Sequence, residues 1–161
     1  MSFWQENAER RAHEFATDRD WSLIRQLGAG YDGVVFEANH RSAVKSLRYQ
    51  ELYERERDVY LRLFDHQLTE VCGCRIPRLL DYSDRLFVVE IGIVQPPFVL
   101  DFAGAYLDRR PEFPNDVFAD WQAEKAEQFG DDWPRVQSIM ATLGGIGVFL
   151  ADVKPGNITF R

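Results

Sequence analysis

Three closely spaced glycines, Gly28, Gly30 and Gly33, lie between two segments with strand-forming character, residues 22–27 and 34–38. Dinucleotide-binding folds share this spacing but place it between a strand and a helix, whereas strands are predicted on both sides here. The pattern therefore predicts a glycine-rich hairpin, whose backbone N–H groups can approach phosphate oxygens without interference from Cβ atoms. A simple glycine-rich turn is the alternative interpretation.

The periodicity of apolar residues predicts a first half rich in strands and a helical second half. Residues 103–116 contain glycine, a charged run and two prolines, and form the best candidate for a boundary between two lobes. Together the elements predict an α+β fold. They are a helix at 4–17, strands at 22–27, 34–38 and 42–47, a helix at 50–68, strands at 85–94 and 98–102, helices at 116–129 and 134–146 ending before Gly147, a loop at 151–156 and a short strand at 157–160.

Lys45 and Glu56 form a candidate ion pair. Lys45 stands in an otherwise apolar strand, twelve residues after Gly33, from which it can reach phosphates under the glycine hairpin; a solvent-facing lysine is the commoner case. Glu56 follows Leu52 by four residues and precedes Val59 by three, so helical periodicity puts its carboxylate on the apolar face. Because burying a lone carboxylate is costly, we expect Lys45 to be its partner. A tolerated glutamate at the edge of an amphipathic helix is the alternative.

A loop near the end of the sequence carries a second set of polar residues, Asp152, Lys154 and Asn157. An aspartate in such a loop can accept a hydroxyl proton, a lysine can neutralise a transferring phosphoryl group, and an asparagine can hold Mg²⁺. A merely polar turn is the alternative, but the spacing and the position between a helix and a strand favour the functional interpretation.

From Leu27 to Phe160 the sequence resembles the protein-kinase-like superfamily, and more closely the small bacterial and atypical kinases. The resemblance implies an α+β fold with a five-stranded antiparallel N-lobe sheet, one main helix and a minimal helical C-lobe. It implies ATP and Mg²⁺ as ligands. By the same resemblance, the phosphates of ATP are bound by Gly28, Gly30 and Gly33 and by Lys45, which is paired with Glu56. Adenine is contacted on its faces by Val35 and Ala43 and at its edge by Asp101 and Ala103, with Leu100 as gatekeeper. In the later loop Asp152 is the base, Lys154 the γ-phosphate ligand and Asn157 the metal ligand.

The implied organisation is an N-terminal helix at 1–20, an N-lobe with hinge at 21–104 and a C-lobe at 105–161. The sequence departs from the kinase pattern at Leu150 and Ala151, where the family usually has His and Arg, and at Asp32, where an aromatic is usual. No Asp-Phe-Gly segment follows the Asp152 loop in this sequence. Three functions therefore stand side by side: an ATP-dependent phosphotransferase, a catalytically inactive pseudokinase that serves as an interaction scaffold, and a part of a longer kinase.

Composition restricts the partners. The formal net charge of -7 argues against nucleic acid and against an anionic membrane surface. No apolar run reaches the roughly 20 residues that span a bilayer, and the start lacks signal-peptide features, so we expect a cytoplasmic protein. Cys72 and Cys74 are expected to be reduced thiols in a loop. The helix at 134–146 is expected to expose an apolar stripe that a protein partner or a homodimer covers, formed by Val136, Ile139, Met140 and Leu143.

Overall fold

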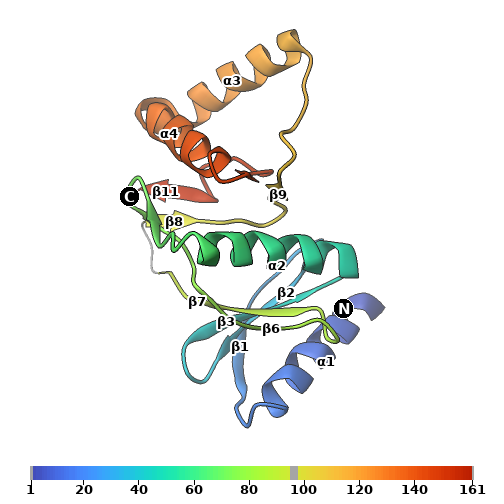
Figure 1. Cartoon of the computed structure of the whole chain (residues 1–161). Coiled ribbons are helices and arrows are strands. Elements are labelled where there is room, and N and C mark those ends of the chain that lie inside the picture. Colours follow the sequence, from blue (N-terminus) through green and yellow to red (C-terminus); the bar gives the residue numbers. More distant parts are fainter. Residues whose placement is uncertain (1, 95–97, 161) are drawn as a thin grey trace. The chain divides into compact units, whose positions relative to one another are not determined.

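The computed structural model describes residues 2–94 and 98–160. The chain divides into two compact units (Figure 1): the first comprises Met1–Leu61 and Pro77–Ile93, and the second Arg62–Ile76 and Val94–Arg161. The sequence predicted a boundary between the two lobes after residue 104, whereas the structure divides the chain after Ile93. Residues 62–76 also differ from the prediction, because they belong to the second unit. None of the helices in the described range combines the length and hydropathy needed to cross a lipid bilayer.

The first unit is built on a five-stranded antiparallel sheet, as predicted. Its strands pair in the order β1-β2-β3-β7-β6, and every neighbouring pair is antiparallel. Helix α1 (Phe3–Thr17) and most of helix α2 (Gln50–Asp65) belong to the same unit. The prediction of an α+β fold with such a sheet is thus confirmed. The strands are β1 (Leu23–Ala29), β2 (Gly33–Ala38), β3 (Ser42–Leu47), β6 (Leu79–Ser83) and β7 (Val88–Gly92).

The membership of this sheet differs from the prediction. The segment 85–94, predicted as one strand, contains a turn at residues 84–87 and then β7. The fifth strand is β6, which the sequence analysis missed, because it lies at a sheet edge and its Leu80 and Tyr82 side chains are exposed. The segment 98–102, predicted as the last strand of this sheet, instead forms β8 (Phe98–Leu100) in another sheet.

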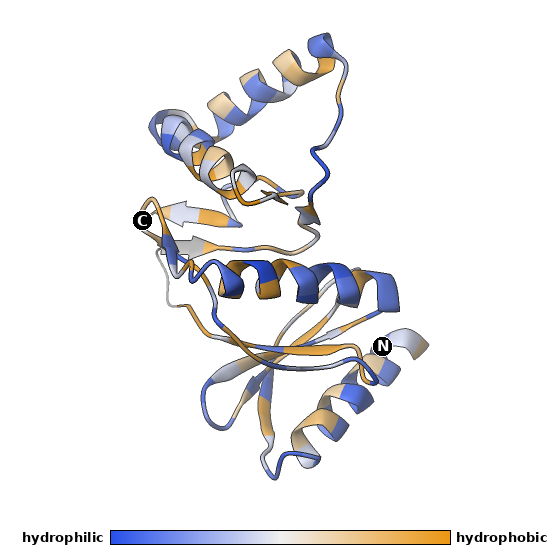
Figure 2. Cartoon of the chain, viewed as in Figure 1, coloured by the Kyte–Doolittle hydropathy of each residue, from blue (hydrophilic) through white to orange (hydrophobic). Residues whose placement is uncertain are grey.

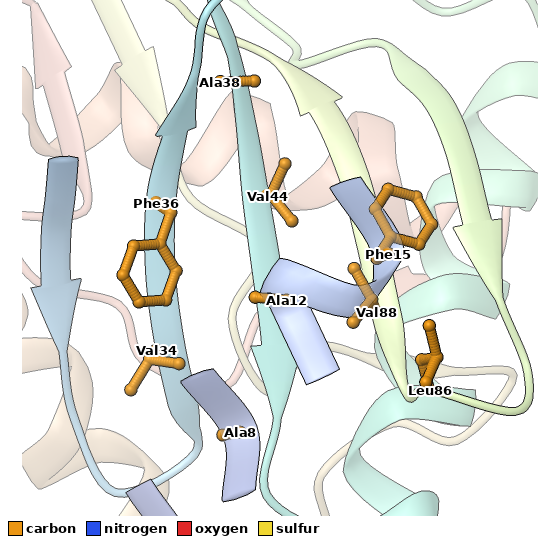
Figure 3. Packing of buried hydrophobic residues seen from close by; sticks show 9 residues of the cluster. All are labelled: Ala8, Ala12, Phe15, Val34, Phe36, Ala38, Val44, Leu86 and Val88. Atoms are coloured by element: carbon orange, nitrogen blue, oxygen red, sulfur yellow. The ribbon is translucent and has the colours of Figure 1, made fainter. Parts of the chain in front are cut away.

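The two helices of the first unit pack on opposite faces of its sheet. Figure 3 shows Ala8, Ala12 and Phe15 of α1 against the side chains of β2, β3 and β7, among them Val44. On the other face Tyr53 of α2 packs with apolar residues of β3 and β7. Both helices show alternating hydrophobic and hydrophilic bands in Figure 2, as one-sided packing requires. Residues 1–20 are therefore part of the first unit rather than a separate segment.

Within the described residues, the second unit contains two small sheets, two helices and the last residues of α2. One sheet has the order β11-β8-β5-β4, with β8 antiparallel to β11 and parallel to β5; the other pairs β9 with β10. The predicted helices are present as α3 and α4, joined by a 3₁₀ turn at Gly130–Asp132. The bounds are β4 (Glu70–Val71), β5 (Cys74–Arg75), β9 (Tyr106–Leu107), α3 (Asn115–Phe129), α4 (Trp133–Gly144), β10 (Val148–Phe149) and β11 (Ile158–Phe160).

Two predictions about the second unit are wrong. Cys74 lies in strand β5 and is buried, rather than standing in a loop, although both cysteines are free thiols. Three residues of the α4 stripe are not exposed, since Val136, Ile139 and Leu143 have 0% exposed surface, whereas Met140 is half-buried. The burial of these residues removes the reason given for a dimer or a protein partner there, and that expectation itself stays a prediction.

Gly147 also differs from its predicted role. Helix α4 ends at Gly144, and Gly147 instead adopts a positive φ of 79° in the turn before β10. A Cβ at this position would overlap the Asp108 carboxylate, which accepts two hydrogen bonds of 2.8 Å from the Arg62 guanidinium. Glycine is thus required both by the backbone conformation and by the close approach of this ion pair.

Candidate functional site

Lys45 and Glu56 form the ion pair that the sequence predicts. The Lys45 Nζ atom donates hydrogen bonds to both carboxylate oxygens of Glu56, each at 2.8 Å. The exposed fractions of the two side chains are 13% and 4%. Because both charges are largely removed from water, removal of either residue would leave the other charge buried without its partner, at a much larger cost in stability than for an exposed pair.

Strand alternation brings this pair together. Val44 points to the face covered by α1, so Lys45, the next residue on β3, points to the face covered by α2. Helix α2 is held to the sheet by Tyr53, whose hydroxyl donates to Asp84 at 2.6 Å. Arg57 donates to the same carboxylate at 2.9 Å. These bonds lower the pKa of Asp84, the Tyr53 hydrogen bond most, while burial raises the pKa of Tyr53.

The three predicted phosphate-binding glycines have different structural roles. Gly30 donates its backbone N–H to the carbonyl of Gly33 at 3.0 Å and so closes the turn between β1 and β2. At Gly33 an added Cβ would overlap the backbone carbonyl oxygen of Ser46, so the sheet itself requires glycine. At Gly28 and Gly30 an added Cβ would meet nothing within 4 Å. The packing of the chain does not explain these two glycines, which suits a role in the close approach of a ligand.

This difference gives a prediction. Gly28→Ala and Gly30→Ala are expected to leave the free energy of unfolding within about 1 kcal/mol of wild type, because their Cβ atoms enter open space. Gly33→Ala is expected to lower it by about 1–3 kcal/mol through overlap with the β3 backbone. Urea denaturation followed by circular dichroism measures all three. Equal destabilisation by the three variants would contradict the assignment of separate roles.

Of the residues predicted to contact adenine, two remain near the Lys45 pair. Val35 of β2 lies opposite Lys45, and Ala43 lies two residues before it on β3. Residues opposite one another across a sheet, and residues two apart along a strand, share a face. Val35, Ala43 and Lys45 are therefore on one face of the sheet, as the kinase-like interpretation requires.

The other three predicted adenine contacts belong to the second unit. Leu100 is fully buried in β8 and pairs with Ile158. The Asp101 amide donates to the carbonyl of Asn157, and the Ala103 amide donates to the Asp101 side chain, each at 2.9 Å. The premise that these residues follow the last strand of the five-stranded sheet is wrong. That strand is β7, which ends at Gly92, and the segment joining it to β8 includes positions 95–97, outside the described residues.

The Asp152 loop is internally bonded. Lys154 Nζ lies 2.9 Å from Asp152 Oδ2, and the Asn157 side-chain amide donates to that oxygen and to the Asp152 carbonyl, each at 3.0 Å. Val153, between them in sequence, is buried and anchors the loop. The hydrogen bond from Lys154 is the main cause that lowers the pKa of Asp152, and Asn157 contributes in the same direction. The structure thus brings all three predicted residues together.

The lowered pKa has a testable pH dependence. We expect Lys154→Ala to raise the pKa of Asp152 towards the ordinary aspartate value of about 3.9. In wild type the lowered pKa stabilises the fold above the pKa of the unfolded chain, and this stabilisation is lost as the pH falls through the folded-state pKa. Carboxyl-carbon NMR titration measures the shift, with Asp152→Asn identifying the signal. An unchanged pKa in the Lys154 variant would contradict the ion pair.

Two cavities of the second unit are lined in part by residues that lie close to Asp152 in the sequence. Leu150, two residues before Asp152, lines an apolar pocket of about 230 Å³. Pro155, three residues after it, lines another of about 200 Å³. The lining of the first pocket was not predicted, because its members come from four separate segments: Arg110, Pro111, Phe113, Phe118, Trp121, Gln122, Met140, Ala141, Phe149 and Leu150.

The chemistry of these side chains suits phosphate and a hard cation. Lysine ammonium groups and open glycine backbone bind phosphate, whereas carboxylate and amide oxygens are ligands for Mg²⁺. Within the described residues no three His, Cys, Asp or Glu side chains cluster to form a metal site of their own. No protein-family model matches the chain, and no curated protein matches it.

Proposed function

We propose that this chain is an ATP-binding, kinase-like phosphotransferase that moves the γ-phosphate of ATP to a hydroxyl acceptor. The observation that carries this proposal is the buried, doubly hydrogen-bonded pair of Lys45 and Glu56, in which Lys45 lies on β3, the strand paired with β2 of the glycine hairpin. Two hydrophobic side chains would fill the same space without the cost of desolvating two charges. The buried lysine is therefore better explained by a functional role of its charge than by stability. A lysine in this position supplies a phosphate ligand.

Within the first unit, the proposed phosphate-binding groups are the open backbone at Gly28 and Gly30 and the Lys45 ammonium. Within the second unit, the proposed catalytic and metal-binding groups are Asp152, Lys154 and Asn157. The amide nitrogen of Asn157 is engaged by Asp152, so its oxygen is the atom suited to Mg²⁺. Mg²⁺, when bound, neutralises phosphate charge.

Asp152 has a lowered pKa and is ionised at neutral pH, which suits a group that accepts a proton. The acceptor hydroxyl gives its proton to Asp152 as its oxygen bonds to the γ-phosphorus. The bond from that phosphorus to the bridging oxygen breaks, and ADP leaves. Lys154, beside Asp152, offsets the negative charge of the transferring group.

Calorimetric titration with ATP, with and without Mg²⁺, tests the proposal. We expect wild type to bind ATP more tightly with Mg²⁺ than without it. Lys45→Met is expected to lower the affinity for ATP by about tenfold or more. Arg25→Ala is the matched control, because Arg25 is also a cation of the first unit but is 68% exposed and pairs with Glu37 on the neighbouring strand. Circular dichroism confirms that each variant is folded.

The outcomes separate the candidate functions. Absence of binding to folded wild type under both conditions would contradict the enzyme proposal. Binding that depends on Lys45, with no transfer to water or to any hydroxyl compound supplied, would favour the pseudokinase interpretation. Equal loss of affinity in the Arg25 and Lys45 variants would point to a general effect of net charge rather than to a phosphate site.

A further inference from the structure

The apolar pocket of about 230 Å³ in the second unit lies outside the residues assigned to the proposed phosphotransfer site. Its lining comes from the loop before α3, from α3 itself, from α4 and from residues 149–150, all of which belong to the second unit. An apolar cavity of about 150 Å³ can hold benzene, whereas the pockets of drug-sized ligands measure about 300–1,000 Å³. The volume therefore suits a single ring that carries one or two short substituents.

The α3 wall of this pocket is a flat aromatic surface. Phe118 and Trp121 lie one helical turn apart, with their ring centroids separated by 5.9 Å and their planes inclined by 16°. Phe118 is still 43% exposed, and Phe113, which also lines the pocket, is 46% exposed. Covering such rings with another ring removes apolar surface from water and adds a stacked or edge-to-face contact. The wall thus favours an aromatic ligand over an aliphatic one.

Arg110 brings a positive charge to the same pocket. Its guanidinium lies 5.7 Å from the ring centroid of Phe149, another lining residue. Arg62 of the same unit is held by both carboxylate oxygens of Asp108, whereas Arg110 forms no ion pair with a carboxylate in the part of the chain that the structure describes. A guanidinium fork binds a carboxylate through two parallel hydrogen bonds. The charge of the pocket therefore favours an anionic substituent on the ring.

We propose that this pocket binds a small aromatic carboxylate, with the ring against Phe118 and Trp121 and the carboxylate on the Arg110 guanidinium. Every group that takes part belongs to the pocket lining, so the inference does not rest on the proposed phosphotransfer function. A neutral aromatic compound would leave the guanidinium without an anion, and an aliphatic acid would lose the stacking contact. Affinity is therefore expected to fall when either the charge or the ring of the ligand is removed.

Titration of the full chain with benzoate at constant ionic strength tests the proposal. The four tryptophans give four indole N–H signals in the NMR spectrum, which variants with one tryptophan replaced by phenylalanine assign. Benzoate is expected to shift the Trp121 signal along a saturable curve and to leave the signals of Trp4 and Trp21, which belong to the first unit, in place. A Trp121 signal that stays still, or equal and non-saturable shifts of all four signals, would overturn the inference.

Two altered ligands separate the recognition of the charge from that of the ring. Benzyl alcohol keeps the ring without the charge and is expected to bind about tenfold more weakly than benzoate. Cyclohexanecarboxylate keeps the charge without the aromatic ring and is expected to bind about three- to tenfold more weakly. Equal affinity for benzoate and benzyl alcohol would contradict the role of Arg110, and equal affinity for the two acids would contradict the stacking contact.

The charge has a matched pair of protein variants. Arg110→Gln is expected to weaken benzoate binding about tenfold and to leave the affinity for benzyl alcohol unchanged. Arg109→Gln removes the neighbouring exposed charge, which is outside the pocket lining, and is expected to leave both affinities unchanged. Equal loss of benzoate affinity in the two variants would show an effect of net charge and would overturn the assignment to the pocket.

Filling the pocket gives a test that leaves the charge intact. Ala141 lines the pocket and is exposed on α4, so Ala141→Leu adds its side chain to the pocket and is expected to weaken benzoate binding tenfold or more. Thr142→Leu, at the next exposed position of the helix and outside the lining, is the control and is expected to bind as wild type does. Circular dichroism confirms that both variants are folded, and unchanged affinity in folded Ala141→Leu would overturn the inference.

A second copy of the chain is the competing occupant of the pocket. It would broaden the Trp121 signal increasingly with protein concentration in the absence of any ligand, and that result would overturn the inference. A sharp signal at all protein concentrations, together with saturable benzoate binding, supports the small-molecule site. ATP is absent from all of these titrations, so their outcome does not depend on the proposed ATP site.

Discussion

Glu56→Ala is expected to lower the free energy of unfolding by about 3–5 kcal/mol, the range found when one partner of a buried ion pair is removed. The reason is the burial of Lys45, which is 13% exposed and would lose the carboxylate that accepts two of its hydrogen bonds. The same variant is expected to weaken ATP binding, since the ammonium is no longer held in one position. Urea denaturation and calorimetry measure the two effects.

A second variant distinguishes the pair from simple loss of packing. Replacing both residues, as Lys45→Met with Glu56→Leu, is expected to recover most of the stability, because no charge then remains to be desolvated. Glu51→Gln, at an exposed position in the first turn of the same helix, is the control and is expected to change stability by less than about 1 kcal/mol. If Glu56→Ala costs no more than the control, the buried pair contributes nothing and the functional argument from its burial fails.

The Lys45 pair was predictable because local periodicity determines both of its halves. The helical spacing from Leu52 to Val59 places Glu56 on the apolar face of α2, and strand alternation places Lys45 and Val44 on different faces of β3. Both rules depend only on neighbours in sequence. The same holds for the glycine turn and for the Asp152 loop, whose bonds join residues five or fewer positions apart.

The pairing of strands was less predictable, because a partner strand is chosen by the whole fold. β8 has strand-forming residues, but nothing in the segment shows that it pairs with β11 rather than with β7. Four strands, β4, β5, β9 and β10, have two residues each, which is too short for alternation to be visible. The β4–β5 turn also places Cys72 at a positive φ of 49°, a conformation that cysteine rarely adopts and that its sequence does not signal.

Contacts between side chains of different helices and strands could hardly be predicted from the sequence. Val136, Ile139 and Leu143 are fully buried, but the periodicity of their helix could not show whether the rest of the chain covers them.

Phe15→Ala is expected to be as destabilising as the loss of the ion pair, at about 3–5 kcal/mol. Phe15 has 0% exposed surface and lies between α1 and the sheet, with the Trp21 ring at 5.8 Å and the Arg19 guanidinium 3.6 Å from its ring centre. Phe3→Ala is the matched control, because it removes the same side chain from the same helix at a position that is 81% exposed. Urea denaturation followed by circular dichroism compares the two.

The comparison decides whether α1 is part of the folded first unit. α1 covers the face of β3 opposite the one that carries Lys45, so it stabilises the strand without lying on the ligand side. Phe15→Ala should therefore weaken ATP binding only as far as it unfolds the chain, and the affinity of the remaining folded protein should match wild type. Equal stability of the Phe15 and Phe3 variants would mean that the first unit does not need the packing of α1 for its stability. A loss of affinity in fully folded Phe15→Ala would instead mean that α1 controls the conformation of the site.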